Sequence, residues 1–151
     1  VYQSTHAPLP HAVAAPRSSP LAAELASLSM TADELSAASG LSLLELQELE
    51  TYGLLISRSL GPARYFDGEA LLVAKAAKEF GEHGVEPRHL RMFRTAAERE
   101  ASVFEQAVMA VLQQRRPDAR AEASAALERL AVLGERLRGA MMRAALSEYL
   151  D

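Results

Sequence analysis

Two helix-start motifs, eleven residues apart, constrain the fold of this chain more than any other feature. They are TADE at residues 31–34 and SLLE at residues 42–45. In such a capping box the side chain of the first residue accepts a hydrogen bond from the backbone N–H of the fourth, whose carboxylate bonds back to the first. Gly40, between the motifs, suits the left-handed residue that ends a helix. We therefore predict two short helices, over residues 31–39 and 42–52, joined by a tight turn.

The next segment predicts a β-hairpin and a third helix. Gly53 closes the second helix, and the stretches LLISRS and ARYF then flank a Leu-Gly-Pro turn at residues 60–62. Short apolar and β-branched runs on either side of such a turn are typical of a two-stranded wing. Asp67 is placed to cap a helix over residues 68–82. Residues 30–84 are therefore expected to form a winged-helix-like subdomain.

Two long amphipathic helices complete the chain. Pro87 starts one over about residues 87–114, and Pro117 starts another that runs nearly to the end. Two such helices with a short break between them pack as an antiparallel hairpin. The predicted fold class is mainly α: a winged helix-turn-helix followed by a long two-helix antiparallel hairpin over residues 85–151.

The final helix carries a narrow apolar seam that one partner helix does not cover. Its residues follow a 4-3-4-3 spacing: Ala123, Leu127, Leu130, Gly134, Leu137, Met141 and Ala144. We expect a homodimer through about residues 87–149. Its interface residues are predicted to be Leu127, Leu130, Leu137 and Met141. The alternative is a monomer whose wing region folds back over the seam.

The charge distribution argues against DNA binding by the helix-turn-helix itself. The net charge is −4, so the chain lacks the basic footprint of a free-standing nucleic-acid binder. The helix expected over residues 42–52 occupies the position of a DNA-reading helix. It carries Glu45, Glu48 and Glu50 and no Lys or Arg. Carboxylates at this face forgo the counterion release that supplies most non-specific DNA affinity.

Five arginines are the candidates for contact with DNA or another anion: Arg58, Arg64, Arg88, Arg91 and Arg94. The last three recur at three-residue spacing and share one helix face, where they suit a phosphate, an acidic ligand or an acidic partner surface. The alternative is a solvated face supported by pairing of Arg94 with Glu98. Arg58 and Arg64 lie in the expected wing.

Five aromatic residues are expected to converge where the wing meets the helices: Tyr52, Tyr65, Phe66, Phe80 and Phe93. Such a cluster suits an effector pocket, because ligand sites are lined mainly by apolar and aromatic side chains. The alternative is an ordinary hydrophobic core.

No enzyme, metal or cofactor is predicted. The chain has no Cys, which excludes disulfides, thiolate metal ligands and Cys nucleophiles. No acid–base pair or nucleophile pattern accompanies the glutamates. No apolar run reaches the length of a membrane span, so we expect a cytoplasmic protein without a membrane partner. Four of the seven prolines lie in residues 1–29, a Pro/Ala-rich linker or tail with a short helix possible over residues 20–28.

The motifs together resemble those of a known family. The stretches ADELSAASGLSLLELQELETYGLL and GPARYFDGEALLVAKAAKEFGEHGVEPRHLRMF resemble the winged-helix module of MerR-family transcription regulators. More specifically, YFDGEAL followed by GVEPRHLRMFRTAAERE is similar to the C-terminal half of actinobacterial FtsR-type regulators, which are implicated in control of a cell-division gene. The resemblance implies dimerisation or regulation in this half, and DNA binding through an N-terminal domain. The chain, which starts at Val1 rather than Met, is then expected to begin in the linker between them.

The resemblance includes one departure. DNA-binding helices of the family carry Arg where this chain has Leu43, Leu44, Glu45 and Glu48. The winged helix is therefore expected to be degenerate, kept for its fold. The predicted function is the C-terminal dimerisation and regulatory domain of a MerR-family regulator. The alternatives are a small-molecule sensor with a pocket between wing and helices, and direct DNA binding by the winged helix.

Overall fold

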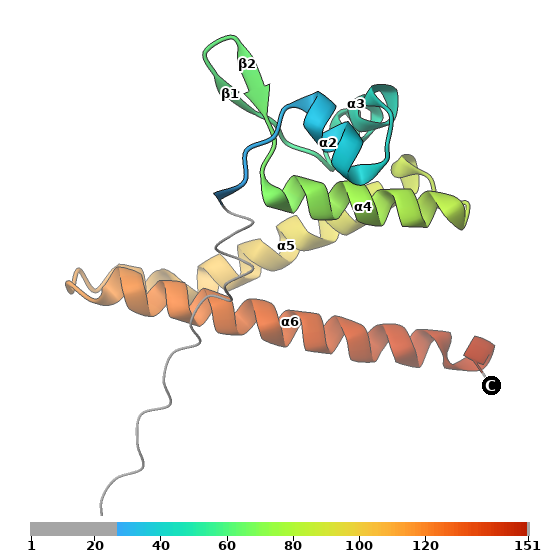
Figure 1. Ribbon diagram of the computed structural model, residues 1–151. Coiled ribbons are helices and arrows are strands. Elements are labelled where there is room, and N and C mark those ends of the chain that lie inside the picture. The colour runs from blue at the N-terminus through green and yellow to red at the C-terminus, as the bar shows by residue number, and fades with distance from the viewer. Residues whose placement is uncertain (1–26, 151) are drawn as a thin grey trace, which may run out of the picture.

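The computed structural model describes residues 27–150. Most of the tail expected over residues 1–29, and of the short helix expected over residues 20–28, lies outside the described residues. Within them the chain is mainly helical, with one small hairpin (Figure 1). The elements in chain order are α2 (Ala32–Ser39), α3 (Leu43–Thr51), β1 (Arg58–Leu60), β2 (Ala63–Tyr65), α4 (Gly68–Glu82), α5 (Pro87–Leu112) and α6 (Ala119–Leu150).

Both capping boxes are confirmed. In the first, Thr31 Oγ1 accepts a hydrogen bond from the Glu34 amide at 3.3 Å, and the Glu34 carboxylate accepts one from the Thr31 amide at 2.8 Å. Ser42 and Glu45 make the same pair of bonds at 3.2 and 2.7 Å. Gly40 ends α2 with a φ of 77°, in the left-handed region that favours glycine.

The β-hairpin is shorter than expected, because the first residues of its predicted first strand instead form the turn that ends α3. The amides of Leu54 and Leu55 donate to the carbonyl of Leu49, so residues 54 and 55 close the end of α3 instead of entering a strand. The paired strands run from Arg58 opposite Tyr65 to Leu60 opposite Ala63. A further bridge, between Met30 and Phe66, was not predicted. Their amides and carbonyls exchange hydrogen bonds of 2.8 and 2.7 Å, which fasten the segment before α2 to the hairpin.

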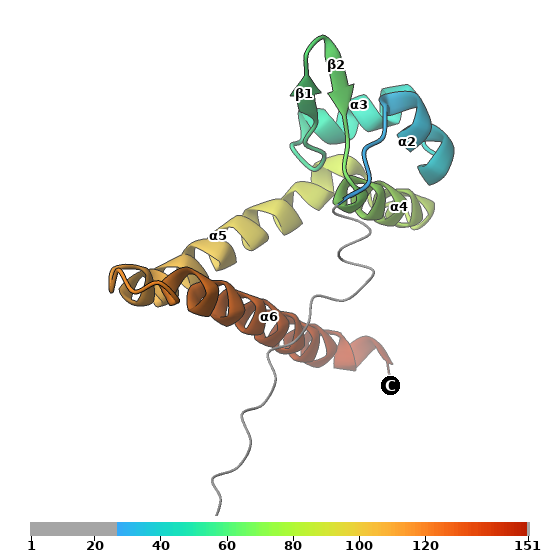
Figure 2. The same cartoon turned by 60° about the vertical axis from the view of Figure 1, so that its left-hand side comes forward.

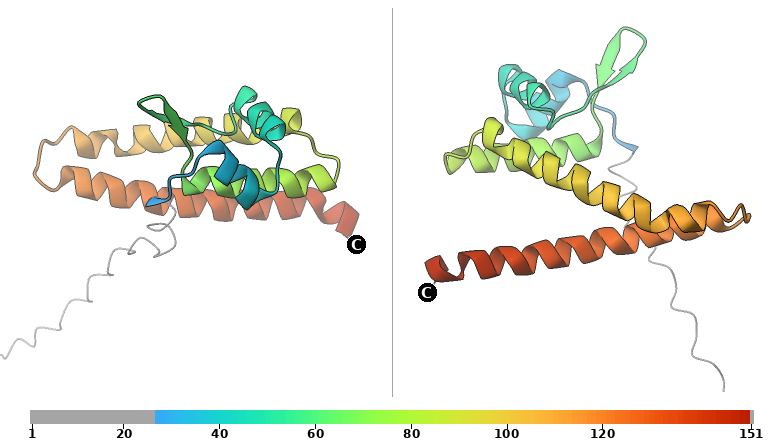
Figure 3. Two further views of the ribbon diagram at one scale, coloured as in Figure 1. Left: turned by 45° about the horizontal axis from the view of Figure 1, so that its top comes forward. Right: turned by 180° about the vertical axis from the view of Figure 1, so that it is seen from behind.

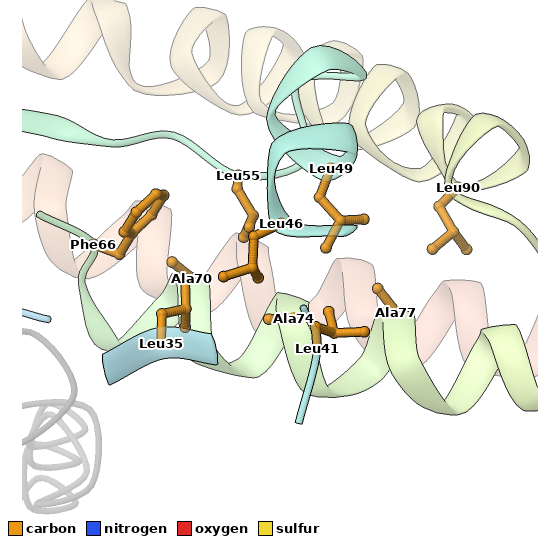
Figure 4. Packing of buried hydrophobic residues seen from close by; sticks show 10 residues of the cluster. All are labelled: Leu35, Leu41, Leu46, Leu49, Leu55, Phe66, Ala70, Ala74, Ala77 and Leu90. Atoms are coloured by element: carbon orange, nitrogen blue, oxygen red, sulfur yellow. The ribbon is translucent and has the colours of Figure 1, made fainter. Parts of the chain in front are cut away.

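One hydrophobic core holds α2, α3 and the hairpin base on α4 and the start of α5 (Figure 4). Its larger members include Leu35, Leu46, Leu49 and Phe66, and α4 contributes mainly alanines. Because alanine side chains are small, they let the neighbouring helices pack close to α4. The core also includes Leu90, so the first turns of α5 belong to this unit. We call the unit (α2, α3, β1, β2, α4 and the first turns of α5) the N-terminal lobe.

Helices α5 and α6 form the predicted antiparallel hairpin, but they pack closely over only part of their lengths. Near the turn, Val108, Ala119 and Ala123 are buried. Farther along, Arg138 forms an ion pair with Glu100. Away from the turn the helices diverge into a V, seen in Figure 2 and in the right-hand view of Figure 3. We call residues 134–149 the distal half of α6.

The last helix begins two residues later than predicted, at Ala119 instead of Pro117. Residues 117 and 118 belong to the turn, where the Ala119 amide donates to the Arg116 carbonyl at 3.1 Å. The Asp118 carbonyl then accepts the first helical hydrogen bond, from Glu122, at 2.9 Å. Among the described residues, no helix combines the length and hydropathy needed to cross a membrane.

Replacing Leu49 by Ala tests the core. Leu49 is 1% exposed. We expect Leu49→Ala to lower the free energy of unfolding by about 2–5 kcal/mol, because it removes buried methyl groups and leaves a cavity. Urea denaturation measures the change. The control, on the same helix, is Leu44→Ala, whose side chain is 75% exposed and whose loss should cost about 0.5 kcal/mol or less. Equal losses for the two variants would contradict this core.

The second capping box makes part of the stability pH-dependent. The backbone N–H and then the hydroxyl of Ser42 donate to Glu45 and lower the pKa of its carboxyl below its usual 4.5. A lowered folded-state pKa stabilises the fold at pH values above the unfolded-state pKa, and that contribution is lost as the pH falls through the folded-state pKa. Glu45→Ala should therefore be less stable than the wild type near neutral pH, and the difference should shrink below pH 4.5. Urea titrations from neutral to acidic pH measure it. A difference independent of pH would contradict the charged cap.

Candidate functional site

The exposed face of α3 combines carboxylates with leucines. Glu45 is tied to its own capping box, and Glu50 forms an ion pair with Arg64 across to β2. The outward positions hold Leu43, Leu44 and Glu48, all exposed. No residue of α3 is basic. The face therefore offers apolar and negative groups where a phosphate-binding helix offers positive ones.

The two arginines of the hairpin are engaged within the chain. Arg58 lies 3.5 Å from the carboxylate of Asp67, the residue that caps α4. Arg64 pairs with Glu50, and its guanidinium also donates to the Ser57 hydroxyl at 2.9 and 3.1 Å. Both side chains remain largely exposed, so these are surface pairs of modest energy. Their positive charges are nevertheless locally balanced.

The three arginines at the start of α5 differ in their surroundings. Arg88 pairs with Glu86 at 2.7 Å. Arg94 pairs with Glu98 at 2.7 Å, as the alternative interpretation of this face expected, and donates from Nη1 to the Gly53 carbonyl at 2.8 Å. The guanidinium of Arg91 makes no ion pair or hydrogen bond with any residue in the described part of the chain. Of the five predicted arginines, Arg91 alone thus has no partner within residues 27–150.

The five predicted aromatic residues do not form one cluster. Phe80 of α4 and Phe93 of α5 meet, with ring centroids 5.6 Å apart, and both remain partly exposed. Phe66 is 2% exposed and belongs to the core, while Tyr65 lies on β2. Tyr65 and Phe66 line a separate small cavity at the base of the hairpin, of about 220 Å³. Tyr52 follows α3 and lies beside Arg91 and Arg94 in another cavity. Successive residues at the end of β2 point to opposite faces, so Phe66 is buried while Tyr65 is only partly buried.

Phe80 and Phe93 form part of an apolar groove of about 470 Å³ between α4, α5 and the segment that leaves α3. The groove is lined by Gly53, Leu54, Ile56, Val73, Ala76, Ala77, Phe80, Leu90, Phe93, Arg94, Ala97 and Glu98. Its volume lies in the usual range for small-molecule sites. Apart from Arg94 and Glu98, which were singled out for a different role, the lining residues outside the predicted aromatic set were missed in the sequence. Within α4 the apolar spacing of Val73, Ala76, Ala77 and Phe80 was the available signal.

A polar pocket of about 320 Å³ adjoins this groove. It is lined by Thr51, Tyr52, Arg91, Arg94, Thr95 and Glu98. Arg94 and Glu98 line both spaces, so their ion pair lies between an apolar surface on one side and a polar, hydroxyl-bearing surface on the other. The unpaired Arg91 belongs to the polar side.

The predicted interface residues of α6 fall into two environments. Leu127 and Leu130 lie in the half that packs on α5 and are half-buried. Leu137 and Met141 lie on the same helix face in the distal half and are 63% and 62% exposed. Met142, Leu146 and Tyr149 are also exposed in the distal half, but the helical spacing places them on another face of α6. Leu137 and Met141 therefore continue the seam that begins inside the hairpin, and nothing in residues 27–150 covers them.

The described residues hold no group of three or more His, Asp or Glu side chains arranged to bind a metal ion. Of the glutamates of α3, Glu45 is bonded to Ser42 in the capping box, Glu50 is paired with Arg64 of the hairpin, and Glu48 faces solvent.

The chain was compared with known protein families and with curated proteins. Residues 28–150 match the Rv1828-like, C-terminal domain family. Two relatives, from Mycobacterium bovis and Mycobacterium tuberculosis, are each 32% identical over 90 residues. Each is named an uncharacterized HTH-type transcriptional regulator. The matched region covers 60% of this chain and 36% of each relative, so the match spans about a third of their length. Because the family match includes nearly all the described residues, the chain belongs to the Rv1828-like C-terminal domain family.

Proposed function

We propose that this chain is the C-terminal dimerisation and regulatory domain of a MerR-family, FtsR-like transcription regulator of the cytoplasm, active in cell-division gene control. Its role is to join two DNA-binding domains, each supplied by an N-terminal region of the same polypeptide. The mycobacterial relatives, named HTH-type transcriptional regulators, support the regulatory assignment.

The observation that carries the proposal is the uncovered apolar face in the distal half of α6. Leu137 and Met141 continue the stripe that Leu127 and Leu130 use inside the hairpin. Burying such a side chain contributes about 1.5–3 kcal/mol, so covering both of them in each subunit favours association. A second copy of the same helix offers a matching face, and two-fold symmetric pairing is the commonest solution for soluble proteins.

The charges on the surface of the lobe support the proposal that another domain contacts the DNA. Glu48 and the neighbouring leucines of α3 provide no phosphate-binding charge. The hairpin arginines, Arg58 and Arg64, are already paired with carboxylates. A dimer joined through α6 fixes the spacing of two separate DNA-binding domains. It also makes binding of the second half-site intramolecular, which raises the overall affinity without new contacts.

A second candidate function is sensing of a small-molecule effector. The apolar groove between α3, α4 and α5 favours this function. Part of the groove is lined by α5, which runs from the lobe into the hairpin with α6. A ligand that binds one arrangement of the lobe and hairpin better than another would shift the dimer geometry.

Charged substitutions in the distal half of α6 test the dimer. The wild-type chain is expected to sediment as a dimer at micromolar concentration. The double variant Leu137→Glu, Met141→Glu should sediment as a monomer, because the partner's apolar face cannot solvate two carboxylates. Sedimentation velocity measures the change, which should be a rise in the dimer dissociation constant of about tenfold or more. The control is Val132→Glu, an exposed apolar position on the opposite side of α6. A wild-type monomer would contradict the proposal.

The proposal also predicts that this chain alone binds DNA poorly. In an electrophoretic mobility shift with the operator of the full-length regulator, the isolated chain should give no shifted band at physiological ionic strength. The chain joined to the N-terminal region should give one. A sequence-specific shift by the isolated chain, lost in Arg58→Ala, Arg64→Ala, would instead favour direct binding by the winged helix.

A further inference from the structure

We propose that the apolar groove and the polar pocket together form one binding site for a small amphiphilic anion, a molecule with an apolar body and a single carboxylate or phosphate group. The inference rests on the second candidate function, effector sensing, and names the chemical class of the effector. It does not depend on whether the domain is dimeric.

The groove provides the surface for the apolar body. The ring centroids of Phe80 and Phe93 lie 5.6 Å apart, and the two side chains are exposed by 38% and 46%. Ile56, which is largely exposed, also lines the groove. The floor is made mainly of small or aliphatic side chains from α4 and α5, which leave room for a ligand. Covering these side chains favours binding of an apolar group in proportion to the area buried.

The polar pocket provides the surface for the anion. Arg91 has no acidic partner within residues 27–150, whereas its neighbours Arg88 and Arg94 are each paired with a carboxylate. The pocket holds two arginines, Arg91 and Arg94, and one carboxylate, Glu98. Its charged side chains therefore sum to one positive charge. Guanidinium groups bind carboxylates and phosphates through paired, charge-assisted hydrogen bonds. Tyr52 adds a phenolic hydroxyl to the same lining.

Arg94 connects the two halves of the site. Its guanidinium lines both spaces, and it is held between Glu98 and the carbonyl of Gly53. Gly53 has a φ of 70°, and a Cβ there would collide with Arg94 Nη1, so this close approach requires glycine. An anion arriving beside Arg91 competes with Glu98 for Arg94. Binding thereby acts on the contact that ties the end of α3 to α5, the helix that leads to the dimerisation hairpin.

The net positive charge at one end favours an amphiphilic anion over a purely apolar occupant, such as the distal helix of a second copy. A helix laid in the groove covers Phe80 and Phe93 but has no need of an unpaired arginine beside them. A neutral apolar ligand likewise leaves Arg91 unused.

Isothermal titration with decanoate and with decyl phosphate, each below its critical micelle concentration, tests the site on the full chain. Methyl decanoate is the neutral control. We expect at least one of the two anions to bind about tenfold or more tightly than the ester, because a hydrogen bond to a charged group is lost in the ester. The better of the two anions identifies the acid group. Equal binding of anions and ester, or no binding, would overturn the proposal.

Two pairs of variants locate the bound anion. Arg91→Gln should weaken anion binding about tenfold and leave ester binding unchanged, whereas Arg88→Gln, on the same helix but outside both spaces, should change neither. Ala76→Phe, which fills the groove from an exposed helix position, should weaken both ligands. Its control is Ala96→Phe, an exposed position of α5 outside the groove. Equal effects of Arg91→Gln and Arg88→Gln would contradict the assignment.

A ¹⁵N-labelled sample separates this proposal from the dimer. Anion addition should shift the amide signals of Gly53, Tyr52 and Arg94. If those signals move instead with protein concentration, and decanoate does not compete, a second copy occupies the groove and the ligand site is disproved. Sedimentation of the same sample reports on dimerisation independently, so either proposal can fail alone.

Discussion

Helix α5 packs against two partners, and this division determines the rest of the structure. Its first turns belong to the core of the N-terminal lobe through Leu90, and its last turns pack on α6 through Val108. A single helix cannot pack along its full length against both the lobe and α6. Helix α6 is 32 residues long, and away from the turn the two helices diverge (Figure 2). The divergence leaves the distal half of α6 with an apolar face that no other part of residues 27–150 covers.

The same division places the groove. Because α5 leaves the lobe at an angle, Phe93 and Ala97 lie between the part of α5 buried in the lobe and the part buried against α6. The groove therefore lies at the junction of the lobe and the hairpin, beside the contact between Arg94 and Gly53. A molecule bound there touches both parts of the chain. Regulation and assembly, the two proposed roles, thus share α5 as their structural link.

Local chemistry made most of the fold predictable. The capping boxes, Gly40 and Asp67 specify helix ends through contacts three or four residues apart, and the structure has these ends where the sequence placed them. The first strand was misplaced because the amides of Leu54 and Leu55 bond back to Leu49, a closure that propensity does not reveal. The groove and the polar pocket draw on α3, α4 and α5 together, so only Phe80, Phe93, Tyr52 and the arginines carried a signal. The apolar spacing of α6 is the same along the whole seam. It therefore cannot show at which residue α5 stops packing against α6.

The most direct test of the central claim, that a second copy covers the distal half of α6, is an isotope-filtered NOE measurement. A sample mixed from ¹³C-labelled and unlabelled chains reports only contacts between subunits. The account predicts intersubunit NOEs from the methyl groups of Leu137 and Met141 to side chains of the other copy. NOEs from these methyl groups only to residues of their own chain would contradict it.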